Sequence, residues 1–287
     1  MKDNDAVDVF ADLMPNAPEV FEEFRQIATE SANDCQTHHE NDMRVMDYAI
    51  YCLLGVFMPA LDKWGRRQQT IIWHEKEKGR AEPSFVFLGL MTNMINSSLA
   101  VRQLAACGLD RQARVVFREM TETGDLLLAI VADEEVMDQY LASPENFEDA
   151  YNHWREALRP AKVRRRVQTL TGNMLFDEAR DVVRQMWKDQ WDLYNWLSKS
   201  AHVDYAALSV ESVAADSENV YNFNVGGRIG HRTGTTIHKL TEYLHFFLTI
   251  LVLFLHSRQG WNAADPELYE AVCLVHSFSE RYRLVNR

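Results

Sequence analysis

The chain has 287 residues, of which 47% are hydrophobic and 25% charged, and its formal net charge is −12. This length suits one or two domains with a large buried core. The 12 glycines and 7 prolines are too few for a collagen-like chain, and they argue against a disordered chain or a many-turned all-β fold. Because 42 acidic residues outnumber 30 basic ones, we exclude a protein that holds nucleic acid by overall charge, and we expect no DNA partner.

Three features of the sequence favour a cytoplasmic protein without a membrane partner. The N-terminal residues MKDNDAVDVFADLMP lack the basic and then apolar pattern of a secretory signal. The cysteines lie far apart without a CxxC pair, as expected of reduced thiols, at Cys35, Cys52, Cys107 and Cys273. The longest apolar run, at 246–255, is about half of the roughly 20 residues that a bilayer requires. It therefore predicts a buried core helix.

Apolar residues recur at helical spacing along most of the chain, whereas alternating strand patterns are nearly absent. The expected helices cover, in chain order, residues 18–35, 42–64, 84–106, 110–132, 134–141, 143–159, 175–205, 235–257 and 266–283. Pro59 is expected to kink the second of these helices, and Asp110 to cap the fourth. Ser143 and Pro144 are a suitable helix start, and Pro160 is expected to break or kink that helix before a basic stretch that continues to 169.

Two stretches, 75–83 and 215–234, are expected to be loops. The second contains a third of all the glycine, at Gly226, Gly227, Gly230 and Gly234, and a small hairpin around 220–228 is an alternative for it. We therefore predict an all-α fold, with residues 1–287 forming a single domain. This domain would be a bundle of about eight helices with one Gly-rich loop before the penultimate helix.

The predicted helix at 110–132 carries polar residues on two sides. A polar stripe with the spacing i, i+4, i+8, i+11 consists of Arg114, Arg118, Glu122 and Asp125. Glu119 falls instead within a second apolar arc, formed by Val115, Leu126 and Ile130. A buried carboxylate must be paired, protonated or bound to a ligand. Either Glu119 meets an arginine of a neighbouring helix while Arg118 and Glu122 form an exposed pair, or Glu119 belongs to a functional site.

In the predicted helix at 175–205, Ser198 and His202 are four residues apart, which places a hydroxyl and an imidazole on one side of the helix. This is half of a nucleophilic site, but activation also needs an orienting group and an oxyanion site. No strand–turn–helix elbow surrounds Ser198, which argues against hydrolase chemistry. We favour a core histidine that bonds to a carboxylate such as Glu119.

A third group of polar residues lies on the predicted helix at 235–257. His238, Glu242 and His245 share one face within two turns, and neutral imidazole with carboxylate suits zinc, iron or manganese. Glu-x-x-His is also the half-motif of di-iron bundles, but the chain has no second copy of it. A mononuclear site would need a further ligand, for which His202 or Glu119 is a candidate. The alternative is a buried polar seam closed by hydrogen bonds.

The glycine-rich segment 226–234 ends at the start of this helix and contains Arg228, His231 and Arg232. Exposed amides and the helix dipole favour an anion such as phosphate there. The segment is not a P-loop, because no Gly-Lys-Ser/Thr follows and no strand precedes it. A surface loop without a ligand is the alternative.

A basic cluster, formed by Lys162, Arg164, Arg165 and Arg166, stands out in this acidic chain. It could bind a phosphate backbone such as that of RNA, although no aromatic residue is interleaved for base stacking. The alternative is a solvated helix face.

The stretches GLDRQARVVFREMTETGDLLLAIVAD and LYNWLSKSAHVDY resemble an uncharacterised, all-helical bacterial family known only as a domain of unknown function. Its pattern has Gly-Leu, small residues, Arg, a hydrophobic pair, Arg and Glu, and then Tyr-x-x-Leu-Ser-x-x-x-His. The matching residues are Gly108, Leu109, Ala113, Arg114, Arg118, Glu119, Tyr194, Leu197, Ser198 and His202. The resemblance spans 84–205. It implies that Glu119 and His202 are a linked polar pair, and it supplies no activity.

The chain is also similar to the HEPN superfamily of helical bundles, many of which are metal-independent ribonucleases in toxin–antitoxin and phage-defence systems. Their signature is an Arg and a His separated by four to six residues near a helix start, and Arg232-x5-His238 has this spacing. The similarity implies that His238 is a general acid or base and Arg232 a phosphate clamp. It also implies a site formed across a homodimer, without a cofactor.

We therefore expect a HEPN-like helical protein of bacterial stress or phage-defence systems that binds or cleaves RNA. One alternative is a metal-dependent enzyme that holds one divalent transition metal at His238, Glu242 and His245. Another is a non-enzymatic interaction module, whose polar seams only set the register of its helices.

Overall fold

The computed structural model describes residues 16–64, 83–174, 180–201, 213–215, 221–223, 227, 229–230 and 232–285. Nearly all of these residues are helical, so the all-α prediction is confirmed. The helices are α2 (Ala17–His38), α3 (Glu40–Trp64), α4 (Pro83–Ala106), α5 (Asp110–Ala132), α6 (Glu134–Leu141), α7 (Phe147–His153), the π-helix η2 (Trp154–Leu158), α8 (Pro160–Met174), α9 (Arg180–Ala201), α11 (Thr233–Gln259) and α12 (Pro266–Val285). Two short strands, β1 (Val213–Ala215) and β2 (Tyr221–Phe223), form an antiparallel pair with Ala214 opposite Asn222.

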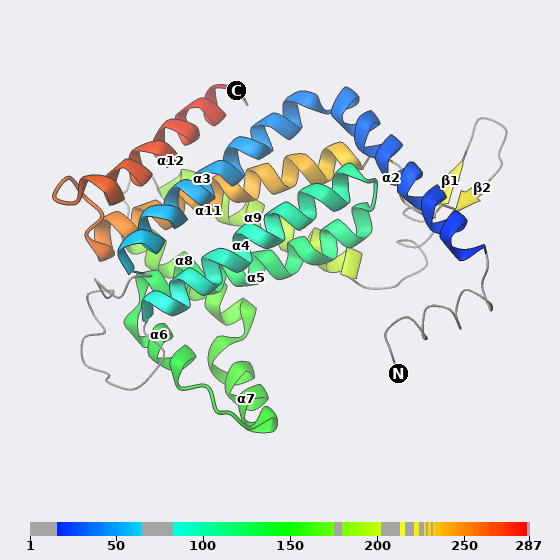
Figure 1. The fold of residues 1–287 in the computed structure, drawn as a ribbon. Coiled ribbons are helices and arrows are strands. Elements are labelled where there is room, and N and C mark those ends of the chain that lie inside the picture. Colours follow the sequence, from blue (N-terminus) through cyan, green and yellow to red (C-terminus); the bar gives the residue numbers. More distant parts are fainter. Residues whose placement is uncertain are drawn as a thin grey trace, which may run out of the picture.

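The long helices are arranged around α5, which packs against α4, α11, α8 and α9. Figure 1 shows α3, α11, α4 and α5 side by side, with α8 and α9 behind them. Helix α12 packs against α3 and α11. Helix α11 lies within this layer because it is apolar on nearly all sides. Its Phe247, Leu251 and Phe254 are fully buried. The apolar run at 246–255 is thus part of the core.

Several helix ends differ from the predicted ones for local reasons. Helix α7 begins at Phe147, not at Ser143, because the Asn146 side chain accepts hydrogen bonds from the backbone N–H groups of Glu148 and Asp149. Asp110 is the first residue of α5 and not its cap. Pro160 begins α8 and thereby ends the π-helical turn before it, since proline provides no backbone N–H to continue that turn.

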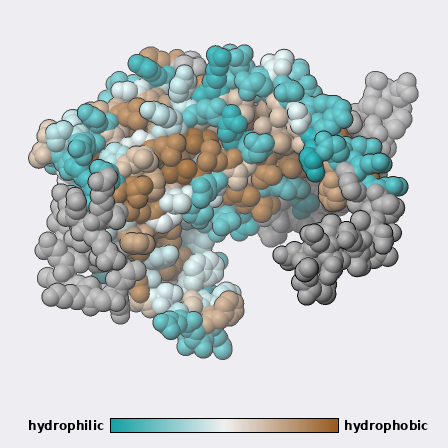
Figure 2. Space-filling model, in the orientation of Figure 1, coloured by the Kyte–Doolittle hydropathy of each residue, from teal (hydrophilic) through white to brown (hydrophobic). Residues whose placement is uncertain are grey.

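Three of the described helices are long and apolar enough to cross a membrane, judged by length and composition alone. They are Glu40–Lys63, Ser84–Ala106 and Thr233–Gln259, with mean hydropathies of 1.4, 1.4 and 1.5. The mean hydropathy of a window tolerates more polar residues than a nearly continuous apolar run does. The longest such run in the sequence is 246–255, and the criterion of the longest run therefore gave no candidate in the other two helices. The fold buries 72% of the third apolar window but only 39% of the first. Hydrophobic side chains accordingly gather on the surface where α3, α4 and α11 run side by side (Figure 2).

Candidate functional site

The polar stripe of α5 faces the interior. Arg114 is 1% exposed and Asp125 3% exposed, because α8 and α9 pack against this side of the helix. Glu119, in contrast, is exposed, and Val115 of the same arc is 46% exposed. The prediction that Glu119 lies in the core and needs a buried partner is therefore wrong. Helices α8 and α9 cover the side of α5 that carries Arg114 and Asp125, and the side that carries Glu119 stays open to solvent.

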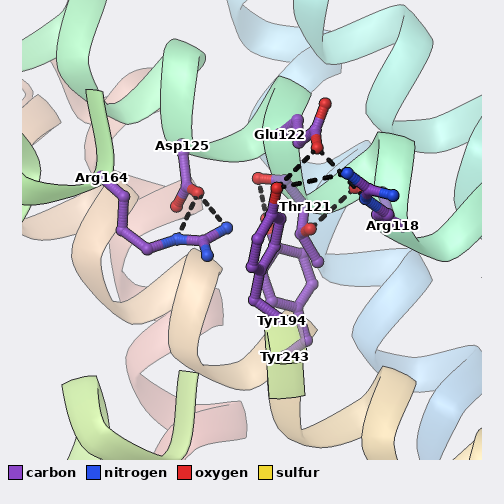
Figure 3. Close-up of polar contacts among 7 residues, drawn as sticks. All are labelled: Arg118, Thr121, Glu122, Asp125, Arg164, Tyr194 and Tyr243. Atoms are coloured by element: carbon purple, nitrogen blue, oxygen red, sulfur yellow. Dashed lines mark hydrogen bonds and ion pairs between the residues drawn. The ribbon is translucent and has the colours of Figure 1, made fainter. Parts of the chain in front are cut away.

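Arg118, Glu122 and Tyr194 form a half-buried network between α5 and α9 (Figure 3). The Tyr194 hydroxyl donates to Glu122 Oε1 at 3.1 Å and accepts from Arg118 Nη2 at 3.5 Å. Arg118 Nε also lies 3.4 Å from Glu122 Oε1, and the two side chains are 31% and 30% exposed. The predicted pairing of Arg118 with Glu122 is thus present, but α9 covers part of it through Tyr194.

A buried ion pair lies beside this network. Arg164 of α8 donates to Asp125 Oδ2 from Nε at 2.7 Å and from Nη2 at 2.6 Å. Its guanidinium group also lies 4.0 Å from the ring centroid of Tyr194 and 5.1 Å from that of Trp191. Burial raises the pKa of Asp125 to about 6, against the lowering effect of Arg164. The prediction that Arg164 binds an anion at the surface is wrong, because its charge is used inside the fold.

The other three residues of the basic cluster line a surface cleft between α6, η2 and α8. The cleft has a volume of about 570 Å³ and includes Lys162, Arg165 and Arg166 in its lining. Arg166 donates to Asp133 at 2.6 Å and to Glu135 at 2.9 Å, and Lys162 donates to the Glu156 carbonyl at 2.8 Å. The cleft therefore carries both signs of charge, and whether it holds RNA stays a prediction.

Some predicted residues lie outside the described part of the chain. These are His202, Arg228 and His231, and the contacts of His202 with Ser198 and with Glu119 stay predictions. Ser198 itself is half-buried, one turn beyond Tyr194 on α9. Within the glycine-rich segment, Gly227 has φ +87°, and a Cβ there would lie 2.2 Å from the Cys107 carbonyl oxygen. Only glycine allows this close approach to the turn between α4 and α5.

The side chains of the predicted metal stripe on α11 turn to different partners. His238 Nε2 lies 3.3 Å from Glu242 Oε1, while Lys239 donates to the other carboxylate oxygen at 2.6 Å. His245 Nε2 lies 2.7 Å from the Ser279 hydroxyl, and its ring stacks on Tyr282 at 4.6 Å. Among the residues that the structure describes, no three His, Cys, Asp or Glu side chains are grouped to hold a metal ion. The positions of these side chains therefore do not support a metal ion at this stripe, which stays a prediction.

A second imidazole, which was not among the predicted site residues, lies beside the start of α11. His39 occupies the bend between α2 and α3, with Nδ1 3.8 Å from Asp42 Oδ2. Its ring lies against Gly234, where an added Cβ would come within 2.8 Å of Cε1. Gly234 precedes His238 by one turn on the same side of α11. The only sequence signal was the spacing of His39 and Asp42, which cannot indicate a contact with α11.

The His39 ring thus lies beside Gly234 at the N-terminal end of α11, and His238 follows Gly234 by one helical turn; each imidazole is next to a carboxylate. The hydrogen bond with Glu242 raises the pKa of His238 above its usual value and holds the pKa of Glu242 at about 2. The side chains of His39 and His238 are 25% and 47% exposed, so both are accessible to solvent. Arg232, the residue before α11, is half-buried at the same end. This arrangement can donate and accept protons beside a cationic group.

Comparison of the chain with protein-family models, with curated proteins and with solved structures finds no match.

Proposed function

We propose that this chain cleaves RNA with His39 and His238 as its acid–base pair and without a metal ion. The observation that carries the proposal is the position of the His39 ring against Gly234, one turn from His238. The similarity to the HEPN superfamily supports the same substrate and assigns His238 and Arg232 to the reaction. We take the setting to be bacterial stress response or phage defence, as that superfamily implies.

The proposed reaction needs two proton transfers at one phosphodiester. His39 accepts the proton of the 2′-hydroxyl, and the 2′-oxygen attacks phosphorus. The bond from phosphorus to the 5′-oxygen then breaks, and His238 gives its proton to that oxygen. His238 suits the acid role because the hydrogen bond with Glu242 raises its pKa and so favours the protonated form that an acid needs. Arg232 and Lys239 supply positive charge for the phosphorane.

The test incubates the full chain with labelled structured RNAs, with and without EDTA, beside His238→Ala and His39→Ala. His276→Ala is the matched control, because His276 Nε2 lies 3.3 Å from Glu280 Oε1 in an equivalent i,i+4 pair on the exposed side of α12. We expect cleavage that survives EDTA, is lost in both site variants and persists in the control.

Two other results would contradict the proposal, and each would favour a different function. Cleavage abolished by EDTA would favour the metal-dependent enzyme with His238, Glu242 and His245. Absence of cleavage from every RNA would favour the non-enzymatic interaction module.

We further propose one domain with a core of about eight main helices, a homodimer and a cytoplasmic location. The homodimer is what the similarity to HEPN proteins implies, and sedimentation equilibrium would test it. A monomer at micromolar concentration would contradict it.

A further inference from the structure

A small pocket lies next to the proposed cleavage site, between α9, α11 and α12. It has a volume of about 220 Å³, and Glu242, the partner of His238, forms part of its wall. Its floor is apolar, with Leu193 and Phe246 both buried. Its polar lining includes Asp189, Gln190 and Arg283. An apolar floor with a few polar groups at the rim is typical of a small-molecule site.

We propose that this pocket binds a nucleobase, preferentially guanine, as the base-recognition subsite of the RNA-cleaving site. The inference rests on the proposed function for its connection to RNA, although the pocket could bind a free guanine nucleotide without it. The ligand is thus a purine base, which either an RNA strand or a mononucleotide can supply.

Two aromatic rings, those of His245 and Tyr282, form part of the pocket wall. The rings of His245 and Tyr282 stack at 4.6 Å with an interplanar angle of 30°, and both line the pocket. The Ser279 hydroxyl, 2.7 Å from His245 Nε2, holds the imidazole in this orientation. Burial lowers the pKa of His245 to about 4 and raises the pKa of Tyr282, so both rings are uncharged at neutral pH. Unstacked RNA bases are commonly recognised on such preformed aromatic surfaces.

Asp189 provides hydrogen-bond acceptors at the rim of the pocket. Asp189 receives one hydrogen bond, from Gln185 at 2.8 Å, and a carboxylate has capacity for several more. Guanine presents two adjacent N–H donors on its Watson–Crick edge, which match the two oxygens of a carboxylate. Adenine, cytosine and uracil do not present such a pair of adjacent donors on two different nitrogens. Asp189 therefore favours guanine over the other bases.

The pocket and the proposed cleavage site share helix α11. His238 and His245 are separated by seven residues on α11, or about 10 Å at a rise of 1.5 Å per residue. Glu242 lies between them, bonded to His238 on one side and lining the pocket on the other. A base in the pocket can thus have its ribose and phosphate extend toward the two imidazoles. Arg283 at the rim adds a positive charge for that backbone.

The test measures binding of 5′-GMP, 5′-AMP, 5′-CMP and 5′-UMP to the full chain by isothermal titration calorimetry. We expect 5′-GMP to bind most tightly. In Asp189→Asn its affinity should fall about tenfold, which is the usual effect of losing one bidentate base contact. Tyr282→Leu should weaken all four nucleotides by removing the stacking surface. Tyr269→Leu is the matched control, because Tyr269 lies on the same helix near His256, outside the pocket lining.

A second arm separates this proposal from the proposed function. His238→Ala should keep the preference for 5′-GMP over the other three nucleotides, and RNA cleavage by the wild type should occur next to guanosine. Guanine-specific binding without RNA cleavage would support the pocket as a free-nucleotide site while the proposed function fails. RNA cleavage without base preference and without mononucleotide binding would overturn the pocket proposal and leave the proposed function standing. Equal binding of all four nucleotides would overturn the assignment to guanine.

Discussion

At the scale of single residues, the buried pair of Asp125 and Arg164 shows how strongly an interior charge depends on its partner. Both side chains are almost fully buried, at 4% and 3% exposure. Such a pair contributes little net stability compared with well-packed apolar residues, but the loss of one partner leaves an unpaired buried charge. We therefore expect the pair to act mainly by holding α5 and α8 in one arrangement.

We expect Asp125→Ala to lower the free energy of unfolding by about 3–5 kcal/mol, because Arg164 would remain charged and buried without its partner. The double variant Asp125→Leu with Arg164→Met should recover most of that loss. Urea denaturation at pH 7 would measure both. Asp181→Ala is the control, since the Asp181–Arg184 pair is exposed and should leave the stability nearly unchanged. A double variant as unstable as the single one would contradict this interpretation.

His238 and Glu242 are expected to titrate as a coupled pair. Glu242 raises the pKa of His238 above 6.5, so this group's contribution to stability is present below pH 6.5 and is lost as the pH rises through the raised value. The pKa of Glu242 is lowered from 4.5 to about 2, so its contribution is present above pH 4.5 and is lost as the pH falls through about 2. The pair is thus fully stabilising between about pH 4.5 and 6.5.

Titration of the His238 ring protons by NMR would test this coupling. In Glu242→Gln the pKa of His238 should fall, because the negative charge of its partner is lost while the amide oxygen can still accept a hydrogen bond. In Glu280→Gln, which alters the equivalent pair on α12, the titration of His238 should not change. An unchanged His238 titration in Glu242→Gln would show that the two side chains do not interact in solution.

At the scale of the elements, the contact between α5 and α11 depends on one glycine. A Cβ at Gly124 would lie 2.0 Å from the Tyr243 hydroxyl oxygen. Tyr243 is buried, and its hydroxyl donates to the Thr121 carbonyl at 3.4 Å. The absence of a side chain at Gly124 therefore lets Tyr243 reach the backbone of α5.

We expect Gly124→Ala to destabilise the fold by about 1–3 kcal/mol, because the cost of overpacking exceeds the gain in helix propensity. Gly89→Ala is the matched control: it is also inside a helix, but a Cβ there has nothing within 4 Å, so the substitution should be neutral or stabilising by up to about 1 kcal/mol. Thermal unfolding of the two variants would measure the difference. Equal unfolding temperatures would mean that Tyr243 can move aside without cost.

At the scale of the whole molecule, the fold buries the apolar helices to different degrees. The most apolar window, in α11, is 72% buried inside the fold, whereas that of α3 is 39% buried. On α3, the exposed apolar side chains follow a three–four spacing at Tyr51, Leu54, Met58 and Leu61. They form a stripe, and the opposite side of this helix packs into the fold.

We expect the chain to remain in the supernatant after lysis without detergent, because α11 already has protein around most of its apolar surface. Ultracentrifugation of the lysate followed by immunoblotting would measure this distribution. Recovery in the membrane pellet, with release by detergent and not by alkaline carbonate, would instead indicate that one or more of the three apolar helices enters the bilayer.

Much of the fold could be predicted from the sequence, since helices depend on local periodicity. The predicted helices at 110–132, 134–141 and 84–106 agree with α5, α6 and α4 to within one residue at each end. The start of α7 was misplaced because two capping signals, Ser143 and Asn146, lie only three residues apart. The periodicity could not favour either one.

The candidate site was predictable only in part. His238 and Glu242 are four residues apart on one helix, so their pairing follows from local geometry alone. Arg118 and Glu122 pair for the same reason. The helical wheel of α5 could not show which polar side becomes buried, because that depends on where α8 and α9 pack.

By itself, the sequence determined that the chain is helical, where most helices lie and which residues share a face, because 3.6-residue periodicity and helix caps act within a few residues. Only the tertiary structure decided that Glu119 is exposed, that Arg164 is buried against Asp125, and that His39 lies beside Gly234. These outcomes depend on contacts between residues far apart in the chain. Such contacts are selected by the packing of whole helices, for which no local pattern provides a signal.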